Sequence, residues 1–130
     1  MIDYNETVNR CSRLLPLSII SRKWAYIVLR TLRKPKTFSQ LLRELHFITN
    51  RILSRELRFL EEQGLINHIS SYSLTNKGLS FLKAIEPLVE WGVRDGHLQQ
   101  CPEEKECSTC EWYPTAVGAR TFSHRMKEMK

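Results

Sequence analysis

The chain has 130 residues, which is enough for one domain with a short appendage. Its hydrophobic content of 42% suits a single small core, and no apolar run is long enough to cross a membrane. The first ten residues lack the basic start and apolar block of a secretory signal, so we expect a cytoplasmic protein.

The formal net charge of +6 is unevenly distributed. Residues 1–60 contain twelve Lys and Arg against four Asp and Glu, whereas residues 61–130 contain eight against ten. A basic first half suggests a polyanionic partner, and nucleic acid is the simplest one. Composition alone leaves the alternative open, which is a solvated basic surface without a partner.

The predicted elements, taken in chain order, favour nucleic acid. Apolar residues at helical spacing predict a helix over about 24–32, and the "KPK" at 34–36 ends it, because the residue before proline avoids helical angles. The run "TFSQLLREL" predicts a second helix with Ser39 as its N-cap. A third helix is expected to begin at Thr49 and to end at Gly64. Two short helices joined by a tight turn form a helix-turn-helix.

The third of these helices carries arginines at i, i+4 and i+7, on a face different from its leucines. Guanidinium groups along one ridge suit contacts with phosphates and with guanine in the major groove. Polar residues near its N-terminal end are placed to meet base edges. The predicted DNA-binding residues are Ser39, Thr49, Asn50, Arg51, Ser54, Arg55 and Arg58. The alternative is a solvated face on which the arginines pair with Glu56, Glu61 and Glu62.

A short hairpin and a long helix are predicted after the helix-turn-helix. The runs "LINHI" and "SYSLT" are β-prone and meet near Ser70. Thr75 is then expected to cap a long helix with a wide apolar stripe that includes Leu82, Ile85 and Val89. Such a stripe needs a covering surface, either the core of the same domain or a second subunit.

A series of short motifs covers most of the chain, from about Cys11 to Trp91. They are Cys11, Leu17, "KW" at 23–24, "LRTL" at 29–32, "TFSQLLREL", "ILSRELRFLEEQGLI" and "YSLTNKG". Their order and spacing resemble the HxlR-type winged helix-turn-helix regulators of bacteria and archaea. The resemblance implies a homodimeric regulator that binds double-stranded DNA. It also implies dimerisation through the first and the long C-terminal helices, and a recognition helix that starts near Thr49.

Two departures from this family pattern affect what is expected. Only "NHISS" separates Ile66 from Tyr72, so the wing should be nearly absent, and His68 is expected to be a polar strand residue. In several relatives a cysteine at the position of Cys11 senses oxidants, and a thiol at a helix N-terminus has a lowered pKa. Pro16 is expected to delay that helix and to leave Cys11 outside its field. Cys11 is therefore a candidate either for redox sensing, as in those relatives, or for a small buried apolar residue, and the second role is favoured.

These patterns predict a mostly α (α+β) fold. It is a winged helix-turn-helix with a much shortened wing, a long C-terminal dimerisation helix and a Cys-rich tail. Residues 1–96 would form the DNA-binding and dimerisation domain, and residues 97–130 would form the tail. The sequence contains no Gly-rich phosphate loop and no arrangement of a nucleophile with a base, so we do not expect an enzyme.

The tail holds three of the four cysteines, spaced as Cys101-x5-Cys107-x2-Cys110. The two-residue gap lets both sulfurs face one ion, which indicates zinc or an iron–sulfur cluster, with His97 or Cys11 as the fourth ligand. A reversible disulfide switch and the absence of any function are the alternatives. The neighbouring glutamates weigh against the switch, because negative charge disfavours a bare thiolate and a bound cation reverses that penalty.

We therefore expect a sequence-specific DNA-binding transcription regulator whose cysteine cluster senses redox state or metal. The tail also weakly resembles the beta subunit of the archaeal transcription initiation factor E, a family that carries an iron–sulfur cluster after a winged helix. That resemblance implies an alternative function, in which the winged helix binds RNA polymerase or another protein. The exposed arginines Arg51, Arg55 and Arg58 distinguish the two functions, because a pure adaptor would not need them.

Overall fold

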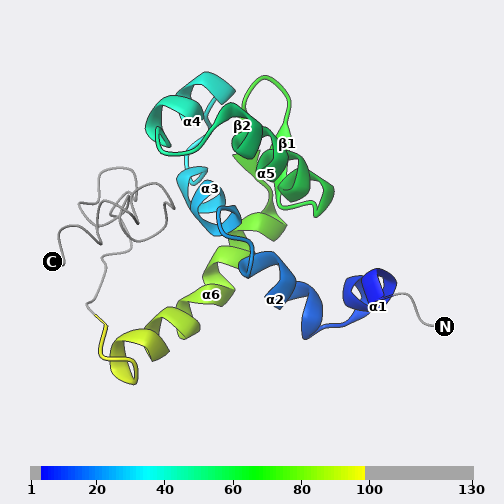
Figure 1. The fold of residues 1–130 in the computed structure, drawn as a ribbon, viewed down its shortest axis with the longest axis vertical. Helices are drawn as coiled ribbons and strands as arrows, with labels where there is room; N and C mark the ends of the chain where they lie inside the picture. Colours follow the sequence, from blue (N-terminus) through cyan, green and yellow to red (C-terminus); the bar gives the residue numbers. More distant parts are fainter. Residues whose placement is uncertain (1–3, 99–130) are drawn as a thin grey trace, which may run out of the picture.

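The structure is a computed structural model and describes residues 4–98. Its elements in chain order are α1 (Tyr4–Arg10), α2 (Leu14–Ile20), α3 (Ala25–Thr31), α4 (Phe38–Glu44), α5 (Asn50–Glu62), β1 (Ile66–His68), β2 (Tyr72–Leu74) and α6 (Asn76–Arg94). Helices α3, α4 and α5 gather with the hairpin into one unit, from which α2 and α6 extend (Figure 1). The predicted winged helix-turn-helix is confirmed. None of the described helices is long and apolar enough to cross a membrane.

The core lies where α3 packs against α5, with α4 and the hairpin closing its sides. Leucines and isoleucines supply most of the buried side chains. Trp24 is a buried packing residue, and the centroid of its ring lies 5.9 Å from that of the Phe47 ring. Removing these side chains from water is the main stabilising contribution of the unit.

Threonines begin the three helices that matter for the site. The hydroxyl of Thr37 accepts a hydrogen bond from the backbone N–H of Gln40, while the Gln40 side chain accepts one from the N–H of Thr37. The N-cap predicted at Ser39 is therefore wrong, because the reciprocal Thr-x-x-Gln box starts α4 two residues earlier. The caps predicted at Thr49 and Thr75 are confirmed, since each hydroxyl accepts from the N–H three residues later.

The N-terminal helix is interrupted before Pro16 and not at it. Helix α1 ends at Arg10 and α2 begins at Leu14, so Pro16 lies in the first turn of α2, where proline removes no helical hydrogen bond. The N–H of Leu14 donates to Sγ of Cys11 at 3.4 Å. Backbone hydrogen bonds from Leu14 and then from Arg13 lower the pKa of the Cys11 thiol. The expectation that Pro16 would leave Cys11 outside the field of the helix is thus wrong.

The wing is a minimal antiparallel hairpin in which Ile66 lies opposite Leu74 and His68 opposite Tyr72. The rings of His68 and Tyr72 stack with centroids 3.8 Å apart, which confirms His68 as a polar strand residue. Tyr72 and Lys36 also exchange two backbone hydrogen bonds of 2.8 and 3.0 Å. These bonds fix the short wing to the segment that precedes α4.

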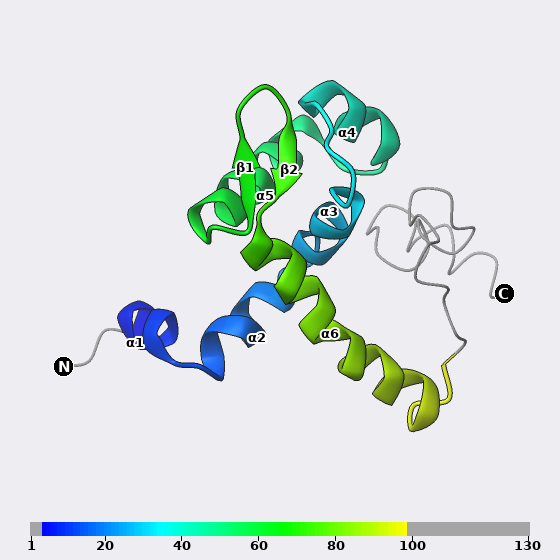
Figure 2. The same ribbon diagram turned by 180° about the vertical axis from the view of Figure 1, so that it is seen from behind.

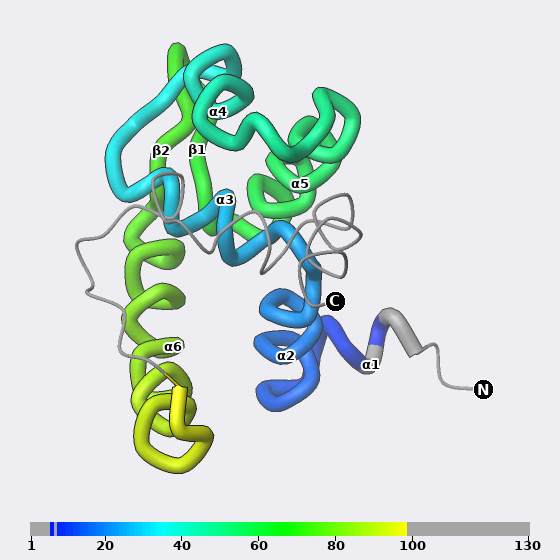
Figure 3. The backbone as a smooth tube through the Cα atoms, turned by 60° about the vertical axis from the view of Figure 1, so that its left-hand side comes forward, coloured from blue at the N-terminus to red at the C-terminus, as the bar shows by residue number. Residues whose placement is uncertain are grey.

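Helix α6 starts in direct backbone contact with the end of α5. The chain leaves α5 through Gly64, whose φ of 75° confirms the predicted stop. The N–H of Thr75 donates to the carbonyl of Leu65 at 3.0 Å, and a Cβ at Gly78 would overlap that carbonyl oxygen. From this anchored start α6 runs away from the unit on the same side as α2 (Figures 2 and 3).

Candidate nucleic-acid interface

Helix α5 is divided into a buried and an exposed face. Three of its leucines, together with Glu56, are at most 2% exposed and point into the core against α3. The residues predicted to contact DNA are exposed on α4, on α5 and at the cap between them; they are Ser39, Thr49, Asn50, Arg51, Ser54, Arg55 and Arg58. The leucines and the arginines therefore lie on different faces, as the sequence pattern predicts.

The buried Glu56 is bound by Arg22, which lies in the turn between α2 and α3. The pair is bidentate, with Nε of Arg22 at 3.0 Å from one carboxylate oxygen and its terminal nitrogen at 2.8 and 3.2 Å from the two oxygens. The guanidinium also lies 3.9 Å from the centre of the Phe59 ring. Arg22 thus attaches α5 to the turn before α3 through both a carboxylate and an aromatic ring.

The arginines of α5 have no carboxylate partner in the part of the chain that the structure describes. Glu56 is held by Arg22, and the ion pairs found between residues 4 and 98 involve none of Arg51, Arg55 and Arg58. This arrangement disfavours the alternative in which the arginines form salt bridges with glutamates of the same helix on a solvated face. It leaves three guanidinium groups presented outward from one helix, which is the geometry that phosphate and guanine contacts require.

A cleft of about 280 Å³ lies between α4, α5 and β2, beside the arginine face. Ser54 and Arg58 line it, together with Phe38 and Tyr72, which sequence reasoning did not assign to the site. Burial, followed by the nearby Glu61 carboxylate, raises the pKa of Tyr72, so this phenol stays a neutral hydrogen-bond donor. An aromatic residue at the first position of a wing strand is the signal that could have identified it.

The predicted metal site is largely outside the described residues. Cys101, Cys107 and Cys110 lie there. His97 is exposed three residues beyond the end of α6, with a φ of 56°, and Cys11 lies in the break between α1 and α2. Among residues 4–98 no group of three or more His, Cys, Asp and Glu side chains could hold a metal ion. The zinc or iron–sulfur ligand set stays a prediction.

Comparison with known proteins identifies the family of this chain. Residues 19–100 match the family described as HxlR-like helix-turn-helix. An uncharacterised HTH-type transcriptional regulator of Methanothermobacter thermautotrophicus is 38% identical over 104 residues, which cover 73% of this chain and 79% of that protein. Another, from Halalkalibacterium halodurans, is 35% identical over 89 residues, which cover 61% of this chain and 79% of that protein.

Solved structures show the same fold. A protein from Enterococcus faecalis V583, assigned to the MarR family of transcriptional regulators, superimposes with a TM-score of 0.60 at 29% identity, covering 75% of this chain and 92% of that one. A Thermoplasma volcanium protein assigned to the HxlR family of transcription factors gives 0.55 at 23% identity, covering 75% and 88%. The family match over 82 consecutive positions, from residue 19 to residue 100, decides the assignment, and the chain belongs to the HxlR-like helix-turn-helix family of transcriptional regulators.

Proposed function

We propose that this protein regulates transcription by binding specific duplex DNA sequences through the exposed face of α5. The observation that carries the proposal is the division of this helix, which buries its leucines and Glu56 and presents Arg51, Arg55 and Arg58 to solvent. A guanidinium group can donate two hydrogen bonds to the O6 and N7 atoms of guanine. The positive end of the helix dipole at Asn50 favours a DNA phosphate at the same edge.

Replacement of Arg55 or Arg58 by Ala is expected to weaken binding by about 1–3 kcal/mol if the lost contact is to a base. Loss of a phosphate contact should instead weaken binding to all DNA sequences almost equally. It should also reduce the slope of log affinity against log salt concentration by about one. A duplex selected from a random library, titrated by fluorescence anisotropy at two salt concentrations, separates the two cases. Arg94→Ala, exposed near the end of α6, is the matched control. Unchanged affinity in both α5 variants would remove this helix from the interface.

We propose further that the protein acts as a homodimer joined along α2 and α6. An apolar groove of about 320 Å³ lies between these parts of the chain, and its lining includes Ile20, Ile27, Ile85 and Val89. Leu17 on α2 and Leu88 and Trp91 on α6 are more than half exposed. A monomer would leave the groove and these exposed apolar side chains in water, whereas a second copy placed on a two-fold axis would cover them.

Leu88→Glu is expected to convert the dimer into a monomer, because it places a charge in the apolar groove. Light scattering at micromolar concentration measures the change directly. Ile69→Glu is the matched control, because Ile69 is 91% exposed at the tip of the wing, away from the groove. Operator half-sites should lie about 34–36 Å apart, one turn of DNA, or a multiple of that distance. A wild-type protein that is monomeric at this concentration contradicts the proposal.

We also propose that the tail senses metal or redox state through Cys101, Cys107 and Cys110, with His97 or Cys11 as the fourth ligand. The support is the two-residue spacing of the last two thiols and the lowered pKa of Cys11. The relatives from Methanothermobacter thermautotrophicus and Halalkalibacterium halodurans are described as transcriptional regulators, which gives no support to a polymerase-binding adaptor.

Cys107→Ser and Cys110→Ser are each expected to abolish bound zinc or iron in protein purified without oxygen, because each removes one thiolate ligand. Metal and sulfide analysis with an absorption spectrum measures the loss. Cys11→Ser is informative as a comparison, because it loses metal only if Cys11 is the fourth ligand. A wild-type protein that contains neither zinc nor iron would show that the sensor proposal is wrong.

A further inference from the structure

The middle of α5 is held by a side chain that comes from another part of the fold. Glu56 is the central residue of the thirteen in this helix, and its carboxylate is bound by Arg22, which lies between α2 and α3. The backbone N–H of Arg22 donates to the carbonyl of Ile19 at 3.3 Å, and Trp24, two residues further on, is buried. The guanidinium group therefore extends from a turn that has its own contacts with the rest of the chain.

The contacts that Arg22 makes with α5 have a defined direction. Its nitrogens lie 2.8–3.2 Å from the carboxylate oxygens of Glu56, and its guanidinium carbon lies 3.9 Å from the centre of the Phe59 ring. Hydrogen bonds weaken steeply as their angle changes, whereas the burial of leucine side chains on the same face is a non-directional contribution. Arg22 thus restrains the rotation of α5 about its own axis.

This rotation determines where the exposed arginines of α5 point. Glu56 directly follows Arg55 in the sequence and Phe59 directly follows Arg58, so each contact of Arg22 lies about 100° around the helix from one of these arginines. The tip of a helical side chain lies about 5–6 Å from the axis, so a rotation of about 10° moves it by about 1 Å. Good donor–acceptor distances span only about 0.5 Å, so a hydrogen bond to a base edge would be lost.

We propose that Arg22 is a positioning residue for DNA recognition, which sets the rotation of α5 so that Arg55 and Arg58 reach base edges together. This inference rests on the proposed role of α5 in DNA binding. Arg22 acts from the buried side of the helix, through a glutamate whose side chain is only 3% exposed. Attraction to phosphates depends on charge and carries no sequence information, so the effect of Arg22 falls on specificity.

The test compares affinities for two duplexes of equal length and composition, one selected from a random library with the wild-type protein and one with a scrambled sequence. Arg22→Lys keeps the positive charge but loses the planar fork that binds both carboxylate oxygens. It should weaken binding to the selected duplex by about tenfold, as expected for one misaligned base contact, and leave binding to the scrambled duplex unchanged.

Two further variants show whether Arg22 acts through Glu56. Glu56→Gln alters a side chain on the buried face of α5 and should cause the same selective loss. The double variant should lose no more specific affinity than either single variant, because both remove one contact. Lys23→Arg is the matched control, since it exchanges the same two cations at the next position, where the ammonium lies 5.0 Å from the centre of the Trp24 ring. It should leave both affinities unchanged.

A purely structural role for Arg22 has a different signature. If the variants only lower the folded fraction, affinity for both duplexes falls by the same factor, and the inference is wrong. A selective loss in Arg22→Lys that Glu56→Gln does not reproduce would show that Arg22 contacts DNA directly, which also overturns it. If Arg22→Lys does not fold, Phe59→Leu should reduce specific affinity alone by about two- to fivefold, and no change counts against the inference.

Failure of this inference can be told apart from failure of the proposed function. Weaker binding of the selected duplex by Arg55→Ala, together with an unchanged ratio of the two affinities in Arg22→Lys, would overturn the positioning role alone. Wild-type protein that binds both duplexes equally would overturn both.

Discussion

Replacing Arg22 by Ala is expected to lower the free energy of unfolding by about 3–5 kcal/mol, because it leaves a buried carboxylate without its cation. The side chain of Glu56 is only 3% exposed, and its two oxygens receive three hydrogen bonds from Arg22. Loss of the guanidinium also removes the contact with the Phe59 ring. Urea unfolding followed by circular dichroism measures the change.

The reverse substitution should be milder. Glu56→Ala leaves Arg22 unpaired, but that side chain is 31% exposed and can be solvated, so a cost of about 1–3 kcal/mol is expected. The double variant should be less destabilised than the sum of the two single variants by more than about 1 kcal/mol, since the residues are in contact. Arg94→Ala, which removes an exposed pair with Asp95, should cost at most about 1 kcal/mol. Additive effects of Arg22→Ala and Glu56→Ala would show that the two residues do not act as a pair.

Gly78→Ala is expected to cost about 3 kcal/mol or more, because the added Cβ overlaps the Leu65 carbonyl oxygen, which belongs to the backbone and cannot rotate away. The same carbonyl accepts the hydrogen bond from Thr75 that begins α6, so any shift also weakens the helix start. The thermal midpoint should fall by roughly 4–8 °C for each kcal/mol in a domain of this size.

Gly64→Ala provides the matched comparison, because it adds the same methyl group fourteen positions earlier in the chain. The nearest atom to its Cβ would be Cδ of Lys77 at 3.8 Å, so space is available and only the left-handed backbone is strained. That strain costs about 1–2 kcal/mol. If both glycine variants lose equal stability, backbone conformation and not the close approach of α6 explains the effect at Gly78.

Local signals in the sequence predicted the parts of the fold that depend on neighbouring residues. The threonine caps at Thr49 and Thr75 and the stop at Gly64 each need only a few adjacent residues, and all three are confirmed. The cap at Ser39 failed because a lone serine was weighed without the Thr-x-x-Gln box two residues earlier. The break before Pro16 was missed because proline is harmless in a first helical turn.

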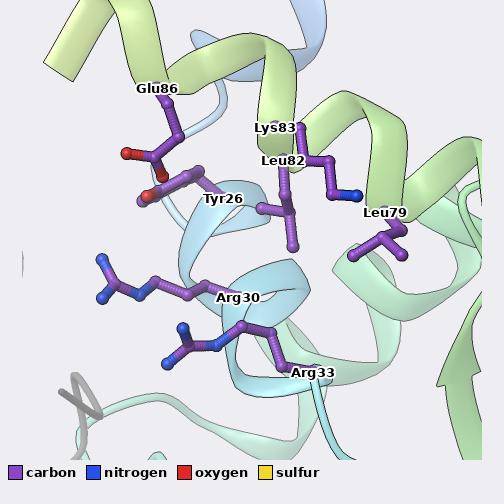
Figure 4. Close-up of a pocket in the computed structure, with 7 residues that line it drawn as sticks. All are labelled: Tyr26, Arg30, Arg33, Leu79, Leu82, Lys83 and Glu86. Atoms are coloured by element: carbon purple, nitrogen blue, oxygen red, sulfur yellow. The ribbon is translucent and has the colours of Figure 1, made fainter. Parts of the chain in front are cut away.

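Long-range contacts explain what the sequence could not predict about the site. Arg22 and Glu56 are 34 residues apart, so no periodicity within one helix connects them. One signal was nevertheless present, because Glu56 follows Leu53 by three residues and precedes Leu60 by four, which places it on the apolar face of α5. A carboxylate at such a position requires a buried cation from elsewhere in the chain. The pocket between α3 and α6 (Figure 4) likewise depends on tertiary packing, because Tyr26 and Leu79, which both line it, are more than 50 positions apart in the sequence.

Arg22 lines the apolar groove and at the same time holds Glu56 of α5. This dual position limits how the protein can be re-engineered. A chimera that receives α5 from a relative would keep its fold only if the donor helix carries a carboxylate at the Glu56 position, or if both residues are exchanged together. The same constraint applies during evolution, because a substitution at Arg22 changes both the lining of the groove and the packing of α5. Changes in the lining of the groove and in the packing of α5 are therefore expected to occur together in this lineage.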